Sequence, residues 1–275
     1  MSDFLVTGAG GLIGAATVAA LRARGADVAG ARRDRHGDVT LDVTDSAGVR
    51  DALATTRPTT VIHTAYLLAD RSATEARAAL ATNIAGFLNV VESSAGAGVR
   101  DFVYASSIAV YTPVSPYGTM KLLNEQQVAA TDAFDRHCGV RIANVYDDVV
   151  GRGQTGWLST AVREALHGRP ARVELAADVQ MGITWARDVG ARLAAIAMSD
   201  RDIAWPATAD GGAEAISGAG IAAALADAGA PSAELGNERY DYPAEIPSPW
   251  LDDVAGGTPT TLGEALKTLC GSGNT

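Results

Sequence analysis

Residues 7–14 read TGAGGLIG and lie between the short apolar run 4–6 and a stretch rich in alanine and leucine. A glycine-rich turn between a strand and a helix is a place for phosphates, because the free N–H groups at the start of the helix face the anion. In this turn Gly8 allows the tight bend, Gly11 lets the backbone approach a pyrophosphate, and Gly14 lets the helix lie against the strand. The stretch therefore predicts a strand, a phosphate-binding turn and a helix at the start of a dinucleotide-binding fold.

The composition is that of a globular chain, with 275 residues, 47% of them hydrophobic and 20% charged. The 22 basic and 32 acidic residues give a net charge of −10, which argues against a broad nucleic-acid surface. No apolar run approaches the roughly 20 residues that cross a bilayer, and no secretory signal precedes the first strand, so we expect a cytoplasmic protein. Cys138 and Cys270 are the only cysteines and are expected to be reduced thiols. The histidines show no metal-ligand spacing, so we expect no metal site.

Apolar runs of strand length alternate with helix-like stretches in the first half of the chain. The runs cover 4–6, 27–31, 60–64, 101–105 and 140–145, and the helix-like stretches cover 15–24, 49–55, 75–93 and 117–134. This alternation predicts an α/β fold with a doubly wound parallel sheet. Beyond residue 146 the pattern is less regular, with helices expected at 157–167, 187–198, 217–228 and after Thr261, and a strand at 172–175.

A phenol and an ammonium group lie one turn apart on one expected helix. Tyr117 and Lys121 share a face of this helix, and Ser115 suits its N-cap, so the pair belongs to the first turn. A free tyrosine has a pKa of about 10 and is a poor acid or base at neutral pH unless positive charge lowers that pKa. Lys121 would supply such charge. Ser106 and Ser107 end the preceding strand at the edge of the sheet where ligands bind.

Several short motifs occur in order along the chain. They are the TGxxGxxG turn itself, VIHTAY for V-x-H-x-A-A, LDVTD, TNIAGFLNVVE, FVYASSIAVYT, SPYGTMKLLNE for SPYGxSK, and RIANVY for R-x-x-N-V-Y-G. Together they resemble the extended short-chain dehydrogenase/reductase superfamily (the NAD-dependent epimerase/dehydratase family), and are similar to its nucleotide-sugar ketoreductases. The resemblance implies a Rossmann dinucleotide-binding domain over 1–146 and a smaller, interwoven substrate-binding part over 147–275, with 186–208 returning to the Rossmann sheet.

The resemblance also implies roles for individual residues. Ser107 would hydrogen-bond the substrate carbonyl, Tyr117 would donate or accept the proton, and Lys121 would bind the ribose and lower the pKa of Tyr117. Asn83 would be the structural asparagine that supports proton supply, and Asn144 would lie near the substrate phosphates. The residues expected at the cofactor are Gly8, Gly11, Leu12, Ile13, Gly14, Arg32, Arg33, Asp42, Val43, Ala65 and Lys121, with Asp42 at the adenine.

The end of the expected second strand distinguishes the two nicotinamide cofactors. An acidic residue there binds the ribose 2′-hydroxyl of NAD, whereas arginine accommodates the 2′-phosphate of NADP. Residues 28–33 read VAGARR, with no acid and with Arg32 and Arg33 side by side. Arg32 can form charge-assisted bonds to a phosphate, which favours NADP(H) over NAD(H). In the alternative interpretation both arginines are solvated and NAD is held by other contacts.

This cofactor preference favours an oxidoreductase that reduces a ketone, and the best interpretation is NADPH-dependent reduction of the 4-keto group of a nucleotide-linked deoxysugar. NADPH would deliver a hydride to a ketone held by Ser107, and Tyr117 would give the proton. Dehydration is disfavoured, because residues 107–109 read SIA where the dehydratases carry a threonine, an aspartate and a glutamate. The alternatives are an NAD-dependent nucleotide-sugar epimerase, a ketoreductase acting on an apolar natural-product ketone, and a non-catalytic cofactor-sensing relative.

Three departures from the family pattern concern the substrate. Residues 147–148 are two aspartates in place of glycine and proline, Met181 replaces an arginine that grips the diphosphate, and the step from Ser107 to Tyr117 is short. We therefore expect a more open pocket, in which Arg152, Arg163 or Arg187 would have to replace the missing arginine. By resemblance, we expect a homodimer that pairs through the helix carrying Tyr117, with a small molecule as the other partner and neither nucleic acid nor membrane.

Overall fold

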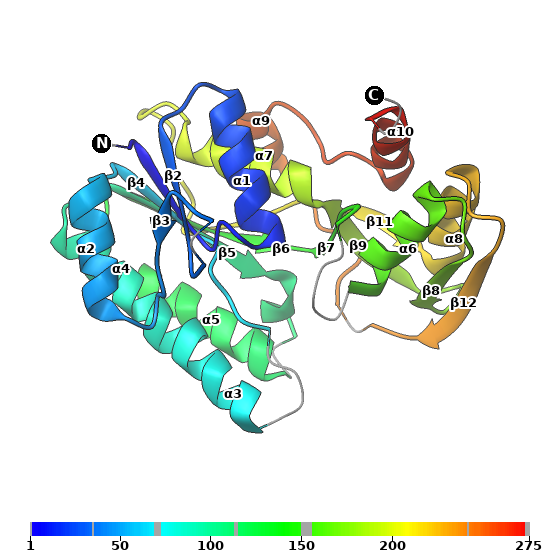
Figure 1. Cartoon of the computed structure of the whole chain (residues 1–275), viewed down its shortest axis with the longest axis horizontal. Helices are drawn as coiled ribbons and strands as arrows, with labels where there is room; N and C mark the ends of the chain where they lie inside the picture. Colours follow the sequence, from blue (N-terminus) through cyan, green and yellow to red (C-terminus); the bar gives the residue numbers. More distant parts are fainter. Residues whose placement is uncertain are drawn as a thin grey trace.

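This computed structural model describes residues 2–34, 36–68, 73–112, 115–149, 156–240 and 242–272. Within them, seven parallel strands form one central sheet (Figure 1). In spatial order the strands are β10 (Thr208–Asp210), β6 (Arg136–Ile142), β5 (Asp101–Ser107), β4 (Thr60–His63), β1 (Phe4–Thr7), β2 (Val28–Arg32) and β3 (Val39–Thr40). The expected doubly wound parallel sheet is confirmed.

Helices cover both faces of this sheet, because its strands are apolar on both sides. On one face lie α1 (Leu12–Ala23), α7 (Ala186–Ala197) and α9 (Pro249–Ala255), and on the other lie α2 (Ser46–Thr56), α4 (Phe87–Gly96) and α5 (Pro116–Ala129) (Figure 1). Phe4 and Val6 belong to the core under α1 and α7, whereas Leu5 belongs to the opposite core. Gly190 of α7 allows the closest helix contact, since a Cβ there would lie 2.4 Å from the backbone of Ala16.

The helix expected over 75–93 is divided in the structure. It comprises α3 (Ala73–Leu80), a π-helical turn (Ala81–Gly86) and α4. π-helical turns are frequent at functional sites, and this one carries Asn83. The helix expected over 117–134 is also shorter, because α5 ends at Ala129 and Phe134 instead stacks on Phe102, with ring centroids 4.9 Å apart.

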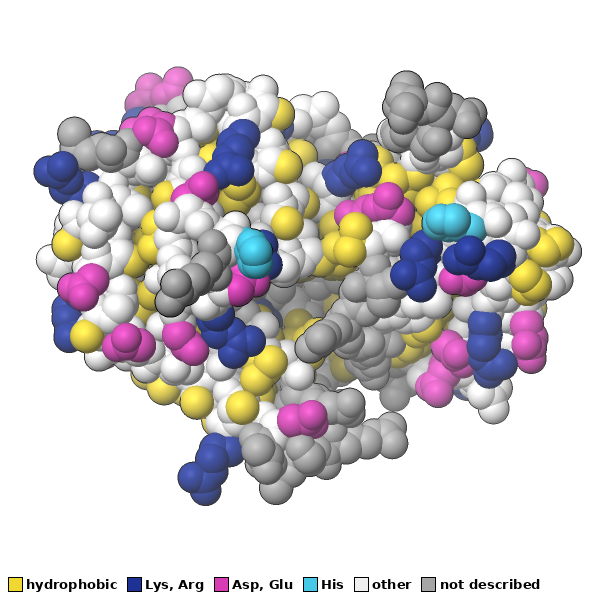
Figure 2. Space-filling view, viewed as in Figure 1, with side chains coloured by type: hydrophobic (Ala, Val, Ile, Leu, Met, Phe, Trp, Pro, Cys, Tyr) yellow, Lys and Arg dark blue, Asp and Glu magenta, His cyan; other side chains and the backbone are white. Residues whose placement is uncertain are grey.

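A smaller part of the molecule has its own sheets and core. The expected strand 140–145 is in fact two strands, since the chain leaves the central sheet after Ile142. A three-stranded sheet joins β11 (Glu214–Ser217), β9 (Gln180–Trp185) and β7 (Asn144–Tyr146), and β12 (Ala233–Glu238) pairs with β8 (Ala171–Leu175). Three helices, α6 (Gly156–Leu166), α8 (Gly218–Asp227) and α10 (Leu262–Ser272), surround these strands. The surface is hollowed between the two parts, and acidic and basic side chains are interspersed on the face in view (Figure 2).

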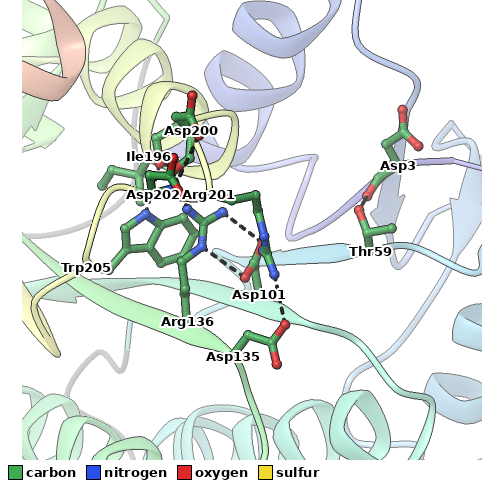
Figure 3. Close-up of polar contacts among 11 residues, drawn as sticks. Asp3, Thr59, Asp101, Asp135, Arg136, Ile196, Asp200, Arg201, Asp202 and Trp205 are labelled. Carbon is green, nitrogen blue, oxygen red and sulfur yellow. Dashed lines mark hydrogen bonds and ion pairs between the residues drawn. The ribbon is translucent and has the colours of Figure 1, made fainter.

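A buried ion cluster lies at the sheet edge opposite the glycine-rich turn (Figure 3). The carboxylate of Asp101, at the start of β5, is 3% exposed and accepts hydrogen bonds from Arg136 (3.0 Å and 3.2 Å) and Arg201 (2.5 Å). Arg136 also lies 4.2 Å over the ring of Trp205. Because Arg201 follows α7, the cluster ties α7 and the approach to β10 to the central sheet. No helix in the described ranges is long and apolar enough to span a membrane.

Candidate active site

The glycine-rich turn packs so closely on itself and on the loop after β4 that two of its glycines have no room for a side chain. Gly8 has a φ of +74°, and a Cβ there would lie 2.5 Å from the amide nitrogen of Ala65. A Cβ on Gly14 would lie 2.2 Å from the carbonyl oxygen of Gly8. Gly11 is the N-cap of α1 and offers no side chain to the first amides of the helix, where Leu12 and Ile13 lie. The turn therefore fits a pyrophosphate, whose charge the helix N-terminus would attract.

Arg32 lies directly above this turn. A Cβ placed on Gly10 would lie 2.9 Å from Nε of Arg32, so the guanidinium group covers the turn at the end of β2. The guanidinium pairs with the Asp34 carboxylate, with Nη2 2.6 Å from Oδ2, and this hydrogen bond lowers the pKa of Asp34. Arg33 is exposed, and no partner is recorded for it among the described residues. Asp38 folds back onto β2 and accepts a hydrogen bond of 2.7 Å from the amide of Gly30.

The other expected cofactor residues lie along the same edge of the sheet. Asp42 is exposed and accepts hydrogen bonds from the amide and hydroxyl of Thr44, at 2.9 Å and 2.8 Å. Val43 is buried against the π-helical turn, where a Cβ on Gly86 would lie 2.7 Å from its Cγ2. Ala65 contacts Gly8, as described above. The structure thus places these residues beside the turn, with Asp42 farther along the chain after β3.

Three side chains expected to carry the chemistry meet at the carboxyl end of β5. Ser107 ends that strand and hydrogen-bonds the hydroxyl of Tyr117, which lies in the first turn of α5. Lys121 follows one turn later, is 5% exposed, and donates a hydrogen bond of 2.6 Å from Nζ to the carbonyl oxygen of Ala105. Ser115 caps α5 as expected, accepting a hydrogen bond of 3.2 Å from the amide of Gly118. The cap fixes the start of the helix and so the position of the phenol.

Burial dominates the electrostatics of this trio. It raises the pKa of Tyr117, while the hydrogen bond from Ser107 lowers that pKa in part. Burial also lowers the pKa of the Lys121 ammonium to about 7, against the attraction of the Glu125 carboxylate. The phenol is therefore protonated at neutral pH in the cofactor-free protein, which suits a proton donor.

Glu125 anchors α5 to the central sheet one turn beyond Lys121. Its carboxylate accepts a hydrogen bond of 2.5 Å from the hydroxyl of Ser106 and two from Arg141, at 3.1 Å and 2.8 Å. Ser106 belongs to β5 and Arg141 to β6, so the buried carboxylate joins the helix to two neighbouring strands. The connection fixes the height of Lys121 and Tyr117 above the sheet.

The hydrogen bonds of Asn83 indicate a structural role, in addition to its expected role in proton supply. Its side-chain oxygen accepts a hydrogen bond from the amide of Leu67, and its side-chain nitrogen donates one to the carbonyl of Leu67, both at 2.8 Å. Its own carbonyl oxygen accepts a hydrogen bond of 3.1 Å from Asn124 of α5. Asn83 therefore holds the loop after β4 against the π-helical turn and α5.

The same loop carries Tyr66, which sequence reasoning did not select. Its ring lies 3.7 Å from Nζ of Lys121 and 5.3 Å, edge to face, from the ring of Tyr117. The only signal in the sequence was that VIHTAY has a tyrosine where the similar motif has its second alanine. Tyr66 thus contacts two members of the trio, Lys121 and Tyr117.

On the side of the smaller part, the structure changes the interpretation of several residues. Asn144 donates a hydrogen bond of 2.8 Å to the carbonyl of Gly182 and so joins β7 to β9. Met181 is 2% exposed in the core of the smaller part and does not face a ligand. Asp147 is buried and accepts a hydrogen bond of 3.2 Å from the indole of Trp185, and burial raises its pKa.

The arginines considered as replacements are dispersed. Arg187 lies 4.7 Å over the ring of Trp185. Arg163 lies on α6 and pairs with Glu164 at 3.7 Å. Arg152 lies outside the described residues. Of these candidates, Arg187 is the one that the structure places close to Asp147, through their shared contact with Trp185.

Comparisons with known proteins agree with this geometry. The sequence profile described as the NAD dependent epimerase/dehydratase family matches residues 4–203. The chain is 33% identical over 157 residues to a UDP-glucose 4-epimerase of Erwinia amylovora, covering 45% of this chain and 47% of that one. It is 30% identical over 207 residues to a dTDP-4-dehydrorhamnose reductase of Streptomyces griseus, covering 70% of this chain and 64% of that one. The matched stretches thus span about half to two thirds of these relatives.

Solved structures cover the whole chain. MoeE5 in complex with UDP-glucose and NAD is 25% identical, with a TM-score of 0.78, and the alignment covers 98% of this chain and 99% of that one. An L-threonine dehydrogenase from Phytophthora infestans is 21% identical, with a TM-score of 0.83 and 98% of both chains covered. The second likeness concerns the fold alone.

Proposed function

Because this chain belongs to the NAD dependent epimerase/dehydratase family, we propose that it catalyses the NADPH-dependent reduction of a ketone, namely the 4-keto group of a nucleotide-linked deoxysugar. The observation that carries the proposal is the hydrogen bond between Ser107 and Tyr117, with the Lys121 ammonium one turn away. The similarity to a dTDP-4-dehydrorhamnose reductase supports this substrate class. MoeE5, which has the same fold, forms complexes with UDP-glucose and with UDP-glucuronic acid, which are nucleotide sugars.

The mechanism follows from the positions of three side chains. The hydroxyls of Ser107 and Tyr117 hold the substrate carbonyl oxygen between them. Tyr117 gives its phenolic proton to the oxygen as negative charge develops there, and Lys121 stabilises the phenolate that results. The turn from Gly8 to Gly14 would hold the phosphates of the cofactor, which would supply the hydride when bound. Ser107 and Lys121 are buried and Tyr117 is half-buried, so little water surrounds these groups and their electrostatic interactions are stronger than in bulk solvent.

The preference for NADP(H) is assigned to Arg32. Its guanidinium group already lies over the glycine-rich turn and would exchange Asp34 for the 2′-phosphate of the cofactor. We expect Arg32→Ala to weaken NADPH binding far more than NADH binding, and Asp34→Asn to strengthen NADPH binding, because that change frees the guanidinium. Titration calorimetry with both cofactors measures this. Equal losses of both affinities in Arg32→Ala would remove the assignment, and Arg24→Ala, an exposed arginine beyond α1, is the control.

An NAD-dependent nucleotide-sugar epimerase is the second candidate, because the Erwinia amylovora relative is a UDP-glucose 4-epimerase. The two candidate enzymes differ in the cofactor that stays bound through purification and in their binding of NADPH and a sugar nucleotide. Titration with NADPH, followed by a thymidine-diphosphate sugar, should show NADPH preference and tighter binding in the presence of the sugar nucleotide. Protein that instead retains NAD through purification is the result expected of the epimerase. Indifference to the nucleotide would favour an apolar ketone as substrate.

Tyr117→Phe tests the proton donor directly. We expect reduction to fall by orders of magnitude with little change in NADPH affinity, because the variant keeps the ring and loses only the hydroxyl. Tyr240→Phe, a half-buried tyrosine that accepts a hydrogen bond from Trp157 in the smaller part, is the matched control. Reduction that survives in Tyr117→Phe would show that another group supplies the proton.

We further propose that the protein is a cytoplasmic homodimer that pairs through α5 and the neighbouring helix. Leu80 at the end of α3 and Leu123 of α5 are 56% and 40% exposed, and the proposed pairing would cover these two apolar side chains. We assign the cofactor to 1–146 together with 186–208, and the substrate to the remainder of 147–275. Sedimentation of the parent and of Leu80→Lys with Leu123→Lys tests the pairing, since the double variant should be monomeric.

A further inference from the structure

The ring of Tyr66 covers the ammonium group on which the proposed reaction depends. Nζ of Lys121 lies 3.7 Å from the centroid of this ring and 6.0 Å from that of Tyr117. The two tyrosine rings meet edge to face, with centroids 5.3 Å apart and an interplanar angle of 79°. One aromatic side chain thus contacts both the ammonium and the phenol of the trio.

The surrounding chain fixes this ring. Tyr66 follows β4 in the loop whose Ala65 touches Gly8, and the next residue, Leu67, is held by two hydrogen bonds with the side chain of Asn83. The hydroxyl of Tyr66 is buried, and burial raises its pKa, so the ring is a neutral phenol. The face of an uncharged ring therefore contacts Lys121. The loop that carries this ring is held by the glycine-rich turn through Ala65 and by Asn83 through Leu67.

A contact with a ring face would stabilise the charged form of the buried Lys121 ammonium. Lys121 has three donors, and the described residues show one hydrogen bond from it, to the carbonyl of Ala105. Burial favours loss of its proton, whereas the negative face of an aromatic ring favours the charged form. The groups that face the ammonium are Tyr66, Tyr117, the Glu125 carboxylate and His63. Burial and the nearby ammonium lower the pKa of His63 to about 3, so it stays neutral.

We propose that Tyr66 is a positioning residue of this site, whose ring face holds the Lys121 ammonium in its charged form beside Tyr117. The proposal deepens the proposed function and rests on it for its role in the reaction, although the contact itself belongs to the cofactor-free protein. Tyr66 has no assigned hydrogen bond to the substrate carbonyl and acts through Lys121. Asn83, by holding Leu67, places the ring.

The chain offers an unusually clean test, because Lys121 and Lys267 are its only lysines. Protein labelled with 13C at lysine Cε gives two signals, and Lys267→Arg assigns the remaining one to Lys121. We would titrate this signal with pH in the parent, in Tyr66→Phe, which keeps the aromatic face, and in Tyr66→Leu, which removes it. We expect the pKa of Lys121 to be unchanged in Tyr66→Phe and lower by about 0.4 to 1.5 units in Tyr66→Leu.

An unchanged or higher pKa in Tyr66→Leu would overturn the proposal, because it would mean that water or Glu125 serves the ammonium as well as the ring does. Circular dichroism checks that each variant is folded. Should Tyr66→Leu fail to fold, Tyr66→Met, a flexible apolar side chain of similar length, provides the same comparison.

Activity separates this proposal from the proposed function. With NADPH and a 4-keto sugar nucleotide, Tyr66→Leu should move the alkaline limb of the kcat profile to lower pH, while Tyr66→Phe should follow the parent. A shifted titration in protein that reduces no such ketone would leave the contact in place and refute the proposed reaction. Normal reduction with no shift in either measurement would refute the role of Tyr66 alone.

Discussion

Gly190→Ala tests how tightly α7 sets the position of α1 and of the phosphate turn before it. A Cβ on Gly190 would lie 2.4 Å from the carbonyl carbon of Ala16 and 2.7 Å from the amide of Thr17. Carbon atoms pack at about 3.5–4.0 Å, so the two helices would have to separate by roughly 1 Å. Such overpacking costs about 1–3 kcal/mol, and the upper half applies because backbone cannot rotate away. Alanine returns about 1 kcal/mol of helix propensity, which leaves a net loss of about 1–2 kcal/mol.

Urea unfolding measures this loss, and titration calorimetry should show weaker NADPH binding, because the displaced α1 carries the turn. Gly263→Ala is the matched control: it also places alanine in a helix, α10, but a Cβ there meets nothing within 4 Å. We expect the control to be as stable as the parent or up to about 1 kcal/mol more stable. If Gly190→Ala behaved like the control in both assays, the close approach of α1 and α7 would contribute neither to stability nor to cofactor binding.

Three further predictions concern stability and reactivity. Lys121→Met should raise the free energy of unfolding by a few kcal/mol at pH 7, because burial lowers the pKa of Lys121 to about 7 from its ordinary value of about 10.4. This gain in stability should shrink as the pH rises from 7 to 10, and urea unfolding at several pH values measures it. Asp101→Ala should cost about 3–5 kcal/mol, since it leaves the buried guanidinium of Arg136 without a carboxylate partner, whereas Asp178→Ala at an exposed ion pair should be close to neutral in the same assay. A thiol reagent should modify Cys270 at once and Cys138 only in denaturant, because Cys138 is buried and burial raises its pKa to about 12.

The sequence predicted the central sheet well because its strands are short apolar runs separated by glycine and by helical periodicity. It did not predict where the chain leaves that sheet. Residues 140–145 are apolar except for Arg141 and Asn144. Hydrophobicity alone does not show that the chain moves from the central sheet to a second sheet after Ile142. β3 and β10 are too short for a periodic pattern, and β12 is largely polar. A π-helical turn leaves little mark, since one extra residue per turn barely disturbs the apolar spacing.

The site shows the same contrast. Ser107, Tyr117 and Lys121 were placed together because a strand end and a helix start follow each other along the chain. Tyr66 lies in the loop after β4 and meets Lys121 only after folding, so no spacing in the sequence predicts the contact. Met181 was interpreted as a change at a ligand, whereas it fills the core of the smaller part, because a motif position gives no measure of burial.

The pairing of β10 with β6 has a consequence for the synthesis of the chain. β6 ends at Ile142, but β10, which covers its open side, begins at Thr208, and about half of the elements of the smaller part are made in between. At about 5–20 residues per second, the nascent chain exposes an unpaired strand edge for several seconds. Such an edge is a template for pairing with other chains. Chains that stop before Thr208 should therefore aggregate even though every residue of the glycine-rich turn and of the Ser107, Tyr117 and Lys121 trio is present.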